Sequence, residues 1–445
     1  MKAGRRLLGP LTILTAVAAM ALLAAAGTSS QAAAAKKPSS GRVVGYFIEW
    51  GIYGRNYTVK NVEDSGSADK LTVMNYAFGN VAPDGNGNVT CQIADPWADY
   101  QKPWAAEESV DGVAVPWGGS LRGNFQQLKA LKALHPGLKV LISIGGWTFS
   151  KYFSDAALTK ESRKRFVSSC IDLFIKGNLP GPVEGDGSGG PGAAAGVFDG
   201  IDVDWEWPGS EGNAGNIVRP EDKANFTKLM QEFRNQLHEA GKQAHEDYQL
   251  SAFLPASPAK IDAGFEVPDI FGALSFATVQ GYDFHGAWET ATNHQSNLYT
   301  SPGDPTSPAF SDDQVVNAYL GRGAPPKELV VGVPFYSRGW TGVNPSNHGL
   351  YQSSSGAAPG TWEAGVDDYK VAKARLSSGF TRYEDSSGAA WLFDGTTFWT
   401  FDDPPVMTAK AEYVRDHKLG GVMFWELSGD TPDGELIHAI ADGLS

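Results

Sequence analysis

Cysteine is scarce in this sequence, and so are metal-ligand patterns. The 445 residues include only two cysteines, Cys91 and Cys170, which excludes a disulfide-rich scaffold. In an exported chain the two could pair, and two buried thiols fit the sequence equally well. The eight histidines show no spacing such as HExxH. We therefore expect no metal site and no cofactor.

Positive charge and long apolar runs are also in short supply. The chain has 36 Lys and Arg against 50 Asp and Glu, for a formal net charge of −14. This acidic excess argues against nucleic acid or anionic lipid as a partner. Beyond the N-terminal region no stretch is long and apolar enough to cross a membrane. We expect a monomer without nucleic-acid or membrane partners.

The N-terminus has the order of a secretory signal peptide. Lys2, Arg5 and Arg6 precede an apolar run at 11–26, and an Ala-rich stretch at 31–35 offers cleavage sites. We predict that residues 1–35 are a signal peptide and that the protein is secreted and extracellular.

Aromatic residues, in contrast, are plentiful: they make up 11% of the chain and include 13 Trp. Many tryptophans stand in Gly- and Pro-rich segments beside polar residues. A loop tryptophan is costly to leave in water unless it binds something flat and apolar, such as the face of a pyranose ring. Any single one could be a loop anchor, but together they favour a carbohydrate ligand. These residues are Trp50, Trp97, Trp104, Trp117, Trp147, Trp288 and Trp340.

Short runs rich in β-branched residues alternate with helical patterns along the chain. The predicted strands are 42–48, 71–78, 139–144, 197–205, 249–254, 274–280, 329–334 and 421–425. The predicted helices between and after them are 125–134, 161–175, 220–240 and 405–417. Eight strands alternating with helices over about 400 residues predict an α/β fold, a (β/α)8 TIM barrel. The alternative is an open doubly wound sheet, but no GxGxxG motif follows the first strand.

Two connections are longer than a minimal barrel needs. One, residues 79–121, follows the second strand; the other separates the seventh and eighth strands. The second contains a helical pattern at 369–376 and strand patterns at 380–383, 389–393 and 397–401. We predict a small α+β insertion at 337–402, between strand 7 and helix 7, with the barrel formed by 36–336 and 403–445. Both excursions leave the carboxyl ends of strands, where barrel active sites lie.

The fourth predicted strand carries acids within an apolar run. Alternate residues of a strand share a face, so Asp202, Asp204 and Glu206 should project together. Three acids on one buried face repel each other unless they share protons. Glu206, at the strand end among tryptophans, should have a raised pKa and act as a general acid. Asp204 shares its strand and face, so we expect it to hold a substrate group rather than attack from the opposite side.

This segment resembles a known family signature. Asp199-Gly200-Ile201-Asp202-Val203-Asp204-Trp205-Glu206 matches the DGxDxDxE motif of glycoside hydrolase family 18, the chitinases, and Ser143-Ile144-Gly145-Gly146 resembles its SxGG strand. The resemblance covers essentially the whole chain after the signal peptide. It implies a secreted chitinase that cleaves β-1,4-linked N-acetylglucosamine polymers with retention. Glu206 would donate the proton, the substrate's acetamide oxygen would form an oxazolinium intermediate, and Asp204 would orient the acetamide N–H.

The same resemblance implies roles for residues on other strands. Tyr282 would donate its hydroxyl to the acetamide oxygen, and Asp283 would contact the sugar across the cleavage point. Trp425 would form the floor beneath the distorted sugar, and Gln280 stands where the family often has Met. Other implied sugar contacts are Tyr46, Phe78, Trp147, Trp288, Tyr336 and Arg338, with structural support from Ser143, Gly145, Gly146 and Asp199.

Some of these roles have structural alternatives. Arg338 could simply form an ion pair, and Tyr46 and Ser143 could be structural hydrogen-bond donors to Asp202. For the whole protein, two other functions share the barrel. An endo-β-N-acetylglucosaminidase acting on glycoprotein glycans shares the acid motif, although its groove must admit branched mannose. A chitin-binding lectin typically lacks the acid at the position of Glu206, which this sequence retains.

Overall fold

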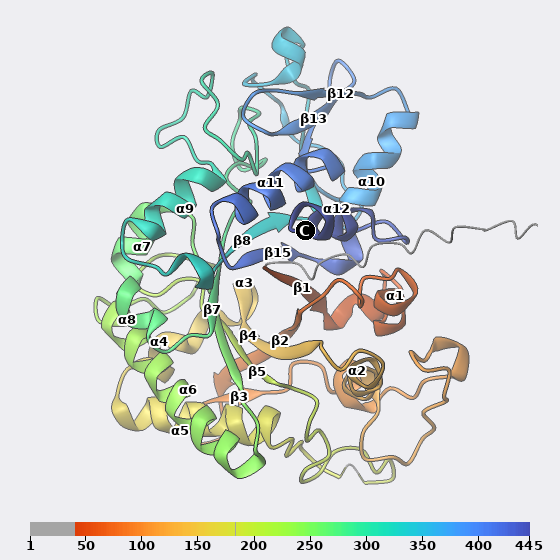
Figure 1. The fold of residues 1–445 in the computed structure, drawn as a ribbon, viewed down its shortest axis with the longest axis vertical. Helices are drawn as coiled ribbons and strands as arrows, with labels where there is room; N and C mark the ends of the chain where they lie inside the picture. The colour runs from red at the N-terminus through yellow and green to blue at the C-terminus, as the bar shows by residue number, and fades with distance from the viewer. Residues whose placement is uncertain (1–40, 183) are drawn as a thin grey trace, which may run out of the picture. The chain divides into compact units, whose positions relative to one another are not determined.

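The computed structural model describes residues 41–182 and 184–445, so the predicted signal peptide lies outside the described residues. Eight parallel strands close into a barrel in the order β1-β15-β8-β7-β6-β5-β4-β2, with β2 pairing back to β1 (Figure 1). They are β1 (Arg42–Ile48), β2 (Val73–Pro83), β4 (Lys139–Gly145), β5 (Gly200–Asp204), β6 (Gln249–Leu254), β7 (Phe276–Val279), β8 (Leu329–Pro334) and β15 (Gly421–Trp425). The predicted (β/α)8 barrel is confirmed, and the open-sheet alternative is wrong.

Helices surround this barrel. The larger ones are α1 (Val59–Asp64), α2 (Gly123–Leu134), α5 (Lys160–Cys170), α6 (Asp222–Ala244), α9 (Asp312–Leu320), α11 (Pro404–Asp416) and α12 (Glu435–Gly443). Shorter ones are α3 (Gly146–Phe149), α4 (Phe153–Ala157), α7 (Pro258–Gly264) and α8 (Val267–Phe271). In α6, Phe226, Leu229, Met230 and Phe233 are buried, the 3–4 residue spacing of an amphipathic helix. Helices of one to three turns carry little periodic signal, which is why α1, α3, α4, α7, α8, α9 and α12 were not predicted.

A second, six-stranded antiparallel sheet follows β8 before the chain returns through α11. Its elements are β9 (Tyr336–Thr341), β10 (Gly356–Ala357), β11 (Val366–Asp368), α10 (Tyr369–Ala374), β12 (Thr381–Glu384), β13 (Ala390–Phe393) and β14 (Phe398–Phe401). The α+β insertion after strand 7 is therefore present. Its first strand was not predicted, because only Phe335 separates it from β8 and no turn residues mark the change of direction.

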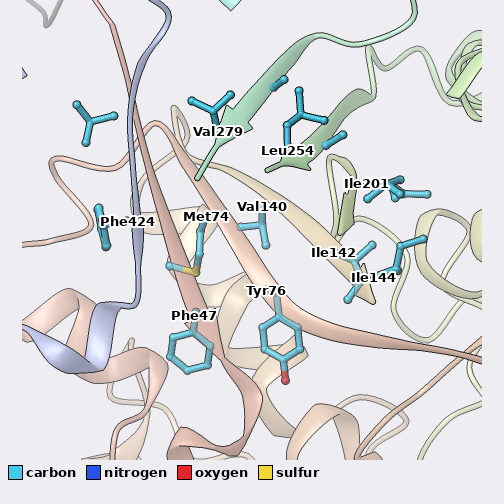
Figure 2. Packing of buried hydrophobic residues seen from close by; sticks show 14 of the residues in the cluster. Phe47, Met74, Tyr76, Val140, Ile142, Ile144, Ile201, Leu254, Val279 and Phe424 are labelled. Atoms are coloured by element: carbon cyan, nitrogen blue, oxygen red, sulfur yellow. The ribbon is translucent and has the colours of Figure 1, made fainter. Parts of the chain in front are cut away.

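Strand alternation divides the barrel core into two layers. Outward-facing residues such as Phe47, Ile142 and Ile201 pack in a large buried cluster with the helices (Figure 2). A second cluster, including Val44 and Leu141, fills the barrel interior. In β5 the outward positions are apolar, so the inward positions are the ones that carry Asp202 and Asp204.

The excursion after β2 is anchored covalently. It forms a hairpin with β3 (Val89–Gln92), and Cys91 of β3 is bonded to Cys170 at the end of α5. Of the two possibilities left open by the sequence, the disulfide is the one observed. Closing a loop of this length restricts the unfolded chain and contributes on the order of 4 kcal/mol in the chain-entropy model.

Two of the seven loop tryptophans are structural anchors, the alternative left open for any one of them. Trp104 is buried and its indole N–H donates to the carbonyl of Gly123. Trp340 lies in β9 and its indole N–H donates to the carbonyl of Glu289. Both are packed anchors, because each buried ring has a backbone acceptor for its polar edge.

Among the helices of the described ranges, none combines the length and apolarity needed to span a bilayer.

Candidate active site

The three acids lie at the carboxyl end of β5, at the barrel mouth. Asp202 and Asp204 are buried and pair in register with Ser143 and Gly145 of β4. Strand β5 ends at Asp204, so the predicted strand to residue 205 is too long and Glu206 lies beyond the regular pleat. Something other than the ladder must therefore hold Glu206 in place.

Ser150, which the sequence analysis did not single out, provides that support. Its hydroxyl accepts from the Glu206 amide (2.9 Å) and lies 2.8 Å from the carbonyl of Gly146 and 3.1 Å from that of Asp204, to which it can donate. On the other side, the Asn216 side-chain amide donates to the Glu206 carbonyl (2.8 Å). The backbone of Glu206 is thus held from two loops, and only its side chain is left to act.

Asp202 is the deepest acid and is fully paired. The hydroxyls of Tyr46 and Ser143 donate to Oδ2 at 2.8 and 2.7 Å, and that of Ser251 donates to Oδ1 at 2.6 Å. The hydrogen bonds expected from Tyr46 and Ser143 are present. Ser251 was missed, because a serine in a strand pattern carries no signal of what it faces. Burial raises the pKa of Asp202, and the three hydroxyls act in the opposite direction.

Asp204 and Glu206 differ from Asp202 in being underpaired. Burial raises the pKa of Asp204 well above its ordinary value, and repulsion from Glu206 and Asp202 adds to the effect. Burial raises the pKa of Glu206 to about 8, with Asp283 adding to the rise and Lys260 opposing it. Within the described part of the chain, Oδ1 of Asp204 is buried without a hydrogen-bond partner. Two carboxyl groups with raised pKa values therefore lie next to each other, and the unpaired oxygen of Asp204 could accept a ligand N–H.

Two glycines allow the chain to pass close to these acids. Gly145 has φ of 108°, and a Cβ there would lie 2.3 Å from the Asp204 carbonyl oxygen. Gly146 has φ of 68°, and a Cβ there would lie 2.6 Å from the Phe78 ring. Both positions exclude other residues by space as well as by backbone conformation. Asp199 supports the opposite end of β5, where it accepts from the Val140 amide and pairs with Lys132.

A second group of polar residues follows β7 and β8. Asp283 accepts from the Tyr336 hydroxyl (2.6 Å) and from Nε of Arg338 (2.9 Å). Arg338 therefore does form an ion pair, the structural alternative raised for it. Tyr282 is buried; burial raises the pKa of its hydroxyl well above the ordinary value, and the largest contribution from a charge comes from Asp204. This places Tyr282 next to the acids of β5.

Aromatic rings form the floor and the rim of the candidate site at the barrel mouth. Trp425, at the end of β15, stacks on Phe78 with centroids 5.6 Å apart and lies 5.3 Å from Tyr46. Trp50, another of the loop tryptophans, lies 6.4 Å from Trp425 and is partly exposed. Trp147 and Trp288 are exposed by 51% and 59%, which leaves ring faces available to a ligand.

Two more side chains lie near this site. Lys260 was not anticipated, and Gln280 already has a hydrogen-bond partner within the protein. Lys260 of α7 lies over the Trp207 ring at 5.3 Å and is the cation that acts on Glu206. Gln280 accepts a hydrogen bond from the Ala256 amide (3.2 Å), so its side chain is tied to the loop after β6.

A closed parallel barrel with a carboxyl of raised pKa, an adjacent buried carboxyl pair and exposed aromatic rings at its mouth has the features of a glycoside hydrolase. The comparison with known families agrees: the model of the glycosyl hydrolases family 18 matches residues 42–430. The chain belongs to that family.

Its relatives include bacterial chitinases. Chitinase 63 of Streptomyces plicatus is 38% identical over 416 residues, which cover 92% of this chain and 61% of that protein. Chitinase A1 of Niallia circulans is 35% identical over 428 residues, covering 88% of this chain and 57% of that protein. The chain thus spans about three fifths of the length of these relatives.

Among solved structures, the catalytic domain of the psychrophilic chitinase B from Arthrobacter TAD20 superimposes with a TM-score of 0.85 at 46% identity. The match covers 91% of this chain and 95% of that one. Chitinase ChiA74 from Bacillus thuringiensis gives a TM-score of 0.77 at 34% identity, covering 91% of this chain and 69% of that one.

Proposed function

We propose that this protein is a secreted chitinase that hydrolyses β-1,4-linked N-acetylglucosamine polymers with retention. One observation carries the proposal: Glu206, whose pKa is raised to about 8, lies beside Asp204, whose buried Oδ1 lacks a partner among the described residues. The first group suits protonation of a glycosidic oxygen, and the second suits an acetamide N–H. Sugars without an acetamide would leave Asp204 unpaired. The N-terminal sequence pattern supports secretion.

In the proposed reaction the substrate supplies its own nucleophile. Glu206 gives its proton to the glycosidic oxygen as the C1–O bond breaks, and the acetamide carbonyl oxygen bonds to C1. Asp204 accepts the acetamide N–H, which increases electron density on that oxygen, and Tyr282 donates its hydroxyl to it. Glu206, now a carboxylate, then takes a proton from water as the water oxygen attacks C1. The acetamide is released and the product keeps its β configuration.

The surrounding residues have corresponding roles in this proposal. Asp283, held by Tyr336 and Arg338, contacts the sugar across the cleavage point. Trp425 carries the distorted sugar on a face widened by Phe78 and Tyr46. Trp147, Trp288 and Gln280 contact the polymer further along. Asp202, satisfied by three hydroxyls, keeps Asp204 in register and shares protons with it.

The two alternative functions are less consistent with the site. A lectin has no use for an acid whose pKa is raised to about 8 and whose backbone is held from two loops. An endo-β-N-acetylglucosaminidase needs space for branched mannose beside the cleavage point, where this chain carries its second sheet and the exposed ring of Trp288.

The configuration of the first product tests the proposal. With chitin hexasaccharide as substrate, we expect NMR to show the β anomer of the shorter oligomers before mutarotation, because two displacements at C1 restore the starting configuration. A glycoprotein glycan is expected to remain intact under the same conditions. An initial α anomer, or cleavage of the glycan alone, would contradict the assignment.

The pH profile provides a second prediction. Hydrolysis needs Glu206 protonated, so kcat/KM should fall as pH rises through about 8. Lys260 lowers the pKa of Glu206, so Lys260→Met should move this alkaline limb to higher pH, by up to about one unit.

Lys223→Met is the matched control for that variant. Lys223, in α6, is partly exposed, and its Nζ donates to the carbonyl of Asp262, which lies in α7 with Lys260. We expect its pH profile to coincide with that of the wild type. A limb that stays in place for Lys260→Met would show that Glu206 is not the group that titrates.

A further inference from the structure

A buried polar segment, Thr292–Asn297, crosses between the barrel and the second sheet. All six of its residues are polar and all are at most 3% exposed. Burying so many polar groups is costly unless each is hydrogen-bonded. Their partners therefore show which parts of the molecule the segment connects.

Two members of the segment bond to the loops that carry the candidate site. The Ser296 hydroxyl donates to the carbonyl of Gly281 at 2.6 Å, directly before Tyr282. The Gln295 carbonyl accepts from the amide of Phe284 at 3.0 Å, directly after Asp283, and its side chain donates to the Tyr336 carbonyl at 2.8 Å. The segment thus brackets the Tyr282–Asp283 turn on both sides. Asp283 has φ of 57°, a conformation that such external bonds must hold.

A buried cation determines the direction of the Ser296 bond. Nζ of Lys410, in α11, donates to both the hydroxyl and the carbonyl of Ser296 and contacts Asp402 at 2.7 Å and Asp312 at 3.0 Å. Burial lowers the pKa of Lys410, but the two carboxylates raise it by more, so the ammonium keeps its protons. An ammonium has no acceptor, so the hydrogen of Ser296 cannot point to Lys410. Of its two acceptors, the Gly281 carbonyl at 2.6 Å is closer than the Asp402 carboxylate at 3.4 Å.

The turn is also confined from the far side. A Cβ at Gly281 would lie 2.1 Å from the Gly332 carbonyl oxygen and 2.6 Å from a carboxylate oxygen of Asp312. The backbone before Tyr282 is therefore pressed between β8 and the carboxylates that hold Lys410. Losing the hydrogen bond from Ser296 would therefore remove one of the few contacts that confine this part of the backbone.

We propose that Ser296, oriented by Lys410, is a positioning residue that holds the Tyr282–Asp283 turn in its reactive geometry. The inference rests on the proposed function, because it concerns the tyrosine that would donate to the acetamide oxygen. It also assigns a role to the junction of the barrel and the second sheet: α9, α11 and the residue directly after β14 each contribute one member of the charged group that orients Ser296.

The test compares Ser296→Ala with Thr292→Val. Thr292 is a matched control: it is equally buried in the same segment, but its hydroxyl bonds to the carbonyl of Gly349, at the end of the short helix η7 (Ser346–Gly349), and not to the turn. Both variants lose one buried hydroxyl, so we expect similar decreases in Tm. On chitin oligomers well below Tm, Ser296→Ala should lower kcat by about ten- to a hundredfold, since a small misplacement of a reacting group has effects of this size. KM should stay near the wild-type value, and Thr292→Val should keep its kcat.

A binding measurement separates positioning from general loss of stability. Chitobiose thiazoline, a stable sulfur analogue of the proposed intermediate, should bind about tenfold or more weakly to Ser296→Ala, and with unchanged affinity to Thr292→Val. If Ser296→Ala does not fold, Ser296→Cys replaces it and should show a smaller decrease, because a thiol is a weaker donor. Equal kcat for the Ser296 and Thr292 variants would overturn the positioning role alone. A wild type that leaves chitin oligomers intact would overturn the proposed function, and this inference with it.

Discussion

Glu206→Gln is expected to lower kcat on chitin oligomers by about a thousandfold or more, since general acid catalysis contributes about 10²–10⁴ and the same group serves twice. The amide has nearly the shape of the acid but holds no transferable proton. The backbone bonds from Ser150 and Asn216 are unchanged by the substitution. Oligosaccharide binding, measured by calorimetry, should therefore remain within a few-fold of the wild type.

Glu211→Gln is the matched control for this prediction. Glu211 is an exposed acid five residues further along the same loop. We expect its activity and pH profile to equal those of the wild type. Near wild-type turnover in Glu206→Gln would mean that another group protonates the leaving oxygen, and the mechanism would have to be reassigned.

Asp204→Asn is expected to reduce kcat on fully acetylated oligomers by about a hundredfold, the size of effect reported for removing one preorganised polar partner. The acetamide N–H would lose a charged acceptor, so its carbonyl oxygen would be a weaker nucleophile. Asp204 and Glu206 also repel each other as anions. Two acids that interact in this way titrate as a pair, so removing one of them should change the pH profile of the variant.

Asp199→Asn serves as the control at the other end of the same strand. Asp199 bonds to Val140 and pairs with Lys132, so its substitution should lower stability without moving the pH profile. Steady-state rates across pH and thermal unfolding of both variants distinguish the two effects. An unchanged rate of Asp204→Asn on an acetylated substrate would refute the assignment of Asp204 to the acetamide.

The parts of the site that lie within one short segment were predictable. The spacing of Asp202, Asp204 and Glu206 indicated a shared face because strand periodicity is a local property. The same reasoning overextended the strand, since nothing in the sequence shows that Ser150 and Asn216 take over from the ladder after Asp204. The hydrogen-bond partners of those acids lie in other parts of the chain, and no local sequence pattern identifies them.

Tryptophan illustrates the limit of composition. Trp50, Trp147 and Trp288 keep exposed surface near the barrel mouth, whereas Trp104 and Trp340 are buried anchors with the same kind of sequence neighbours. The difference depends on whether a backbone carbonyl from a distant segment meets the indole N–H. The location of a tryptophan in a Gly- and Pro-rich stretch does not show whether such a carbonyl is present.

The sequence by itself determined the barrel class and the inward-facing acids, because both follow from alternation within strands and between strands and helices. The tertiary structure decided which groups surround those acids. Ser251 meets Asp202, and Lys410 orients Ser296, only because closing the barrel and adding the second sheet bring segments separated by tens to over a hundred residues into contact. Burial is also what raises the pKa of Glu206, and burial is a property of the folded chain.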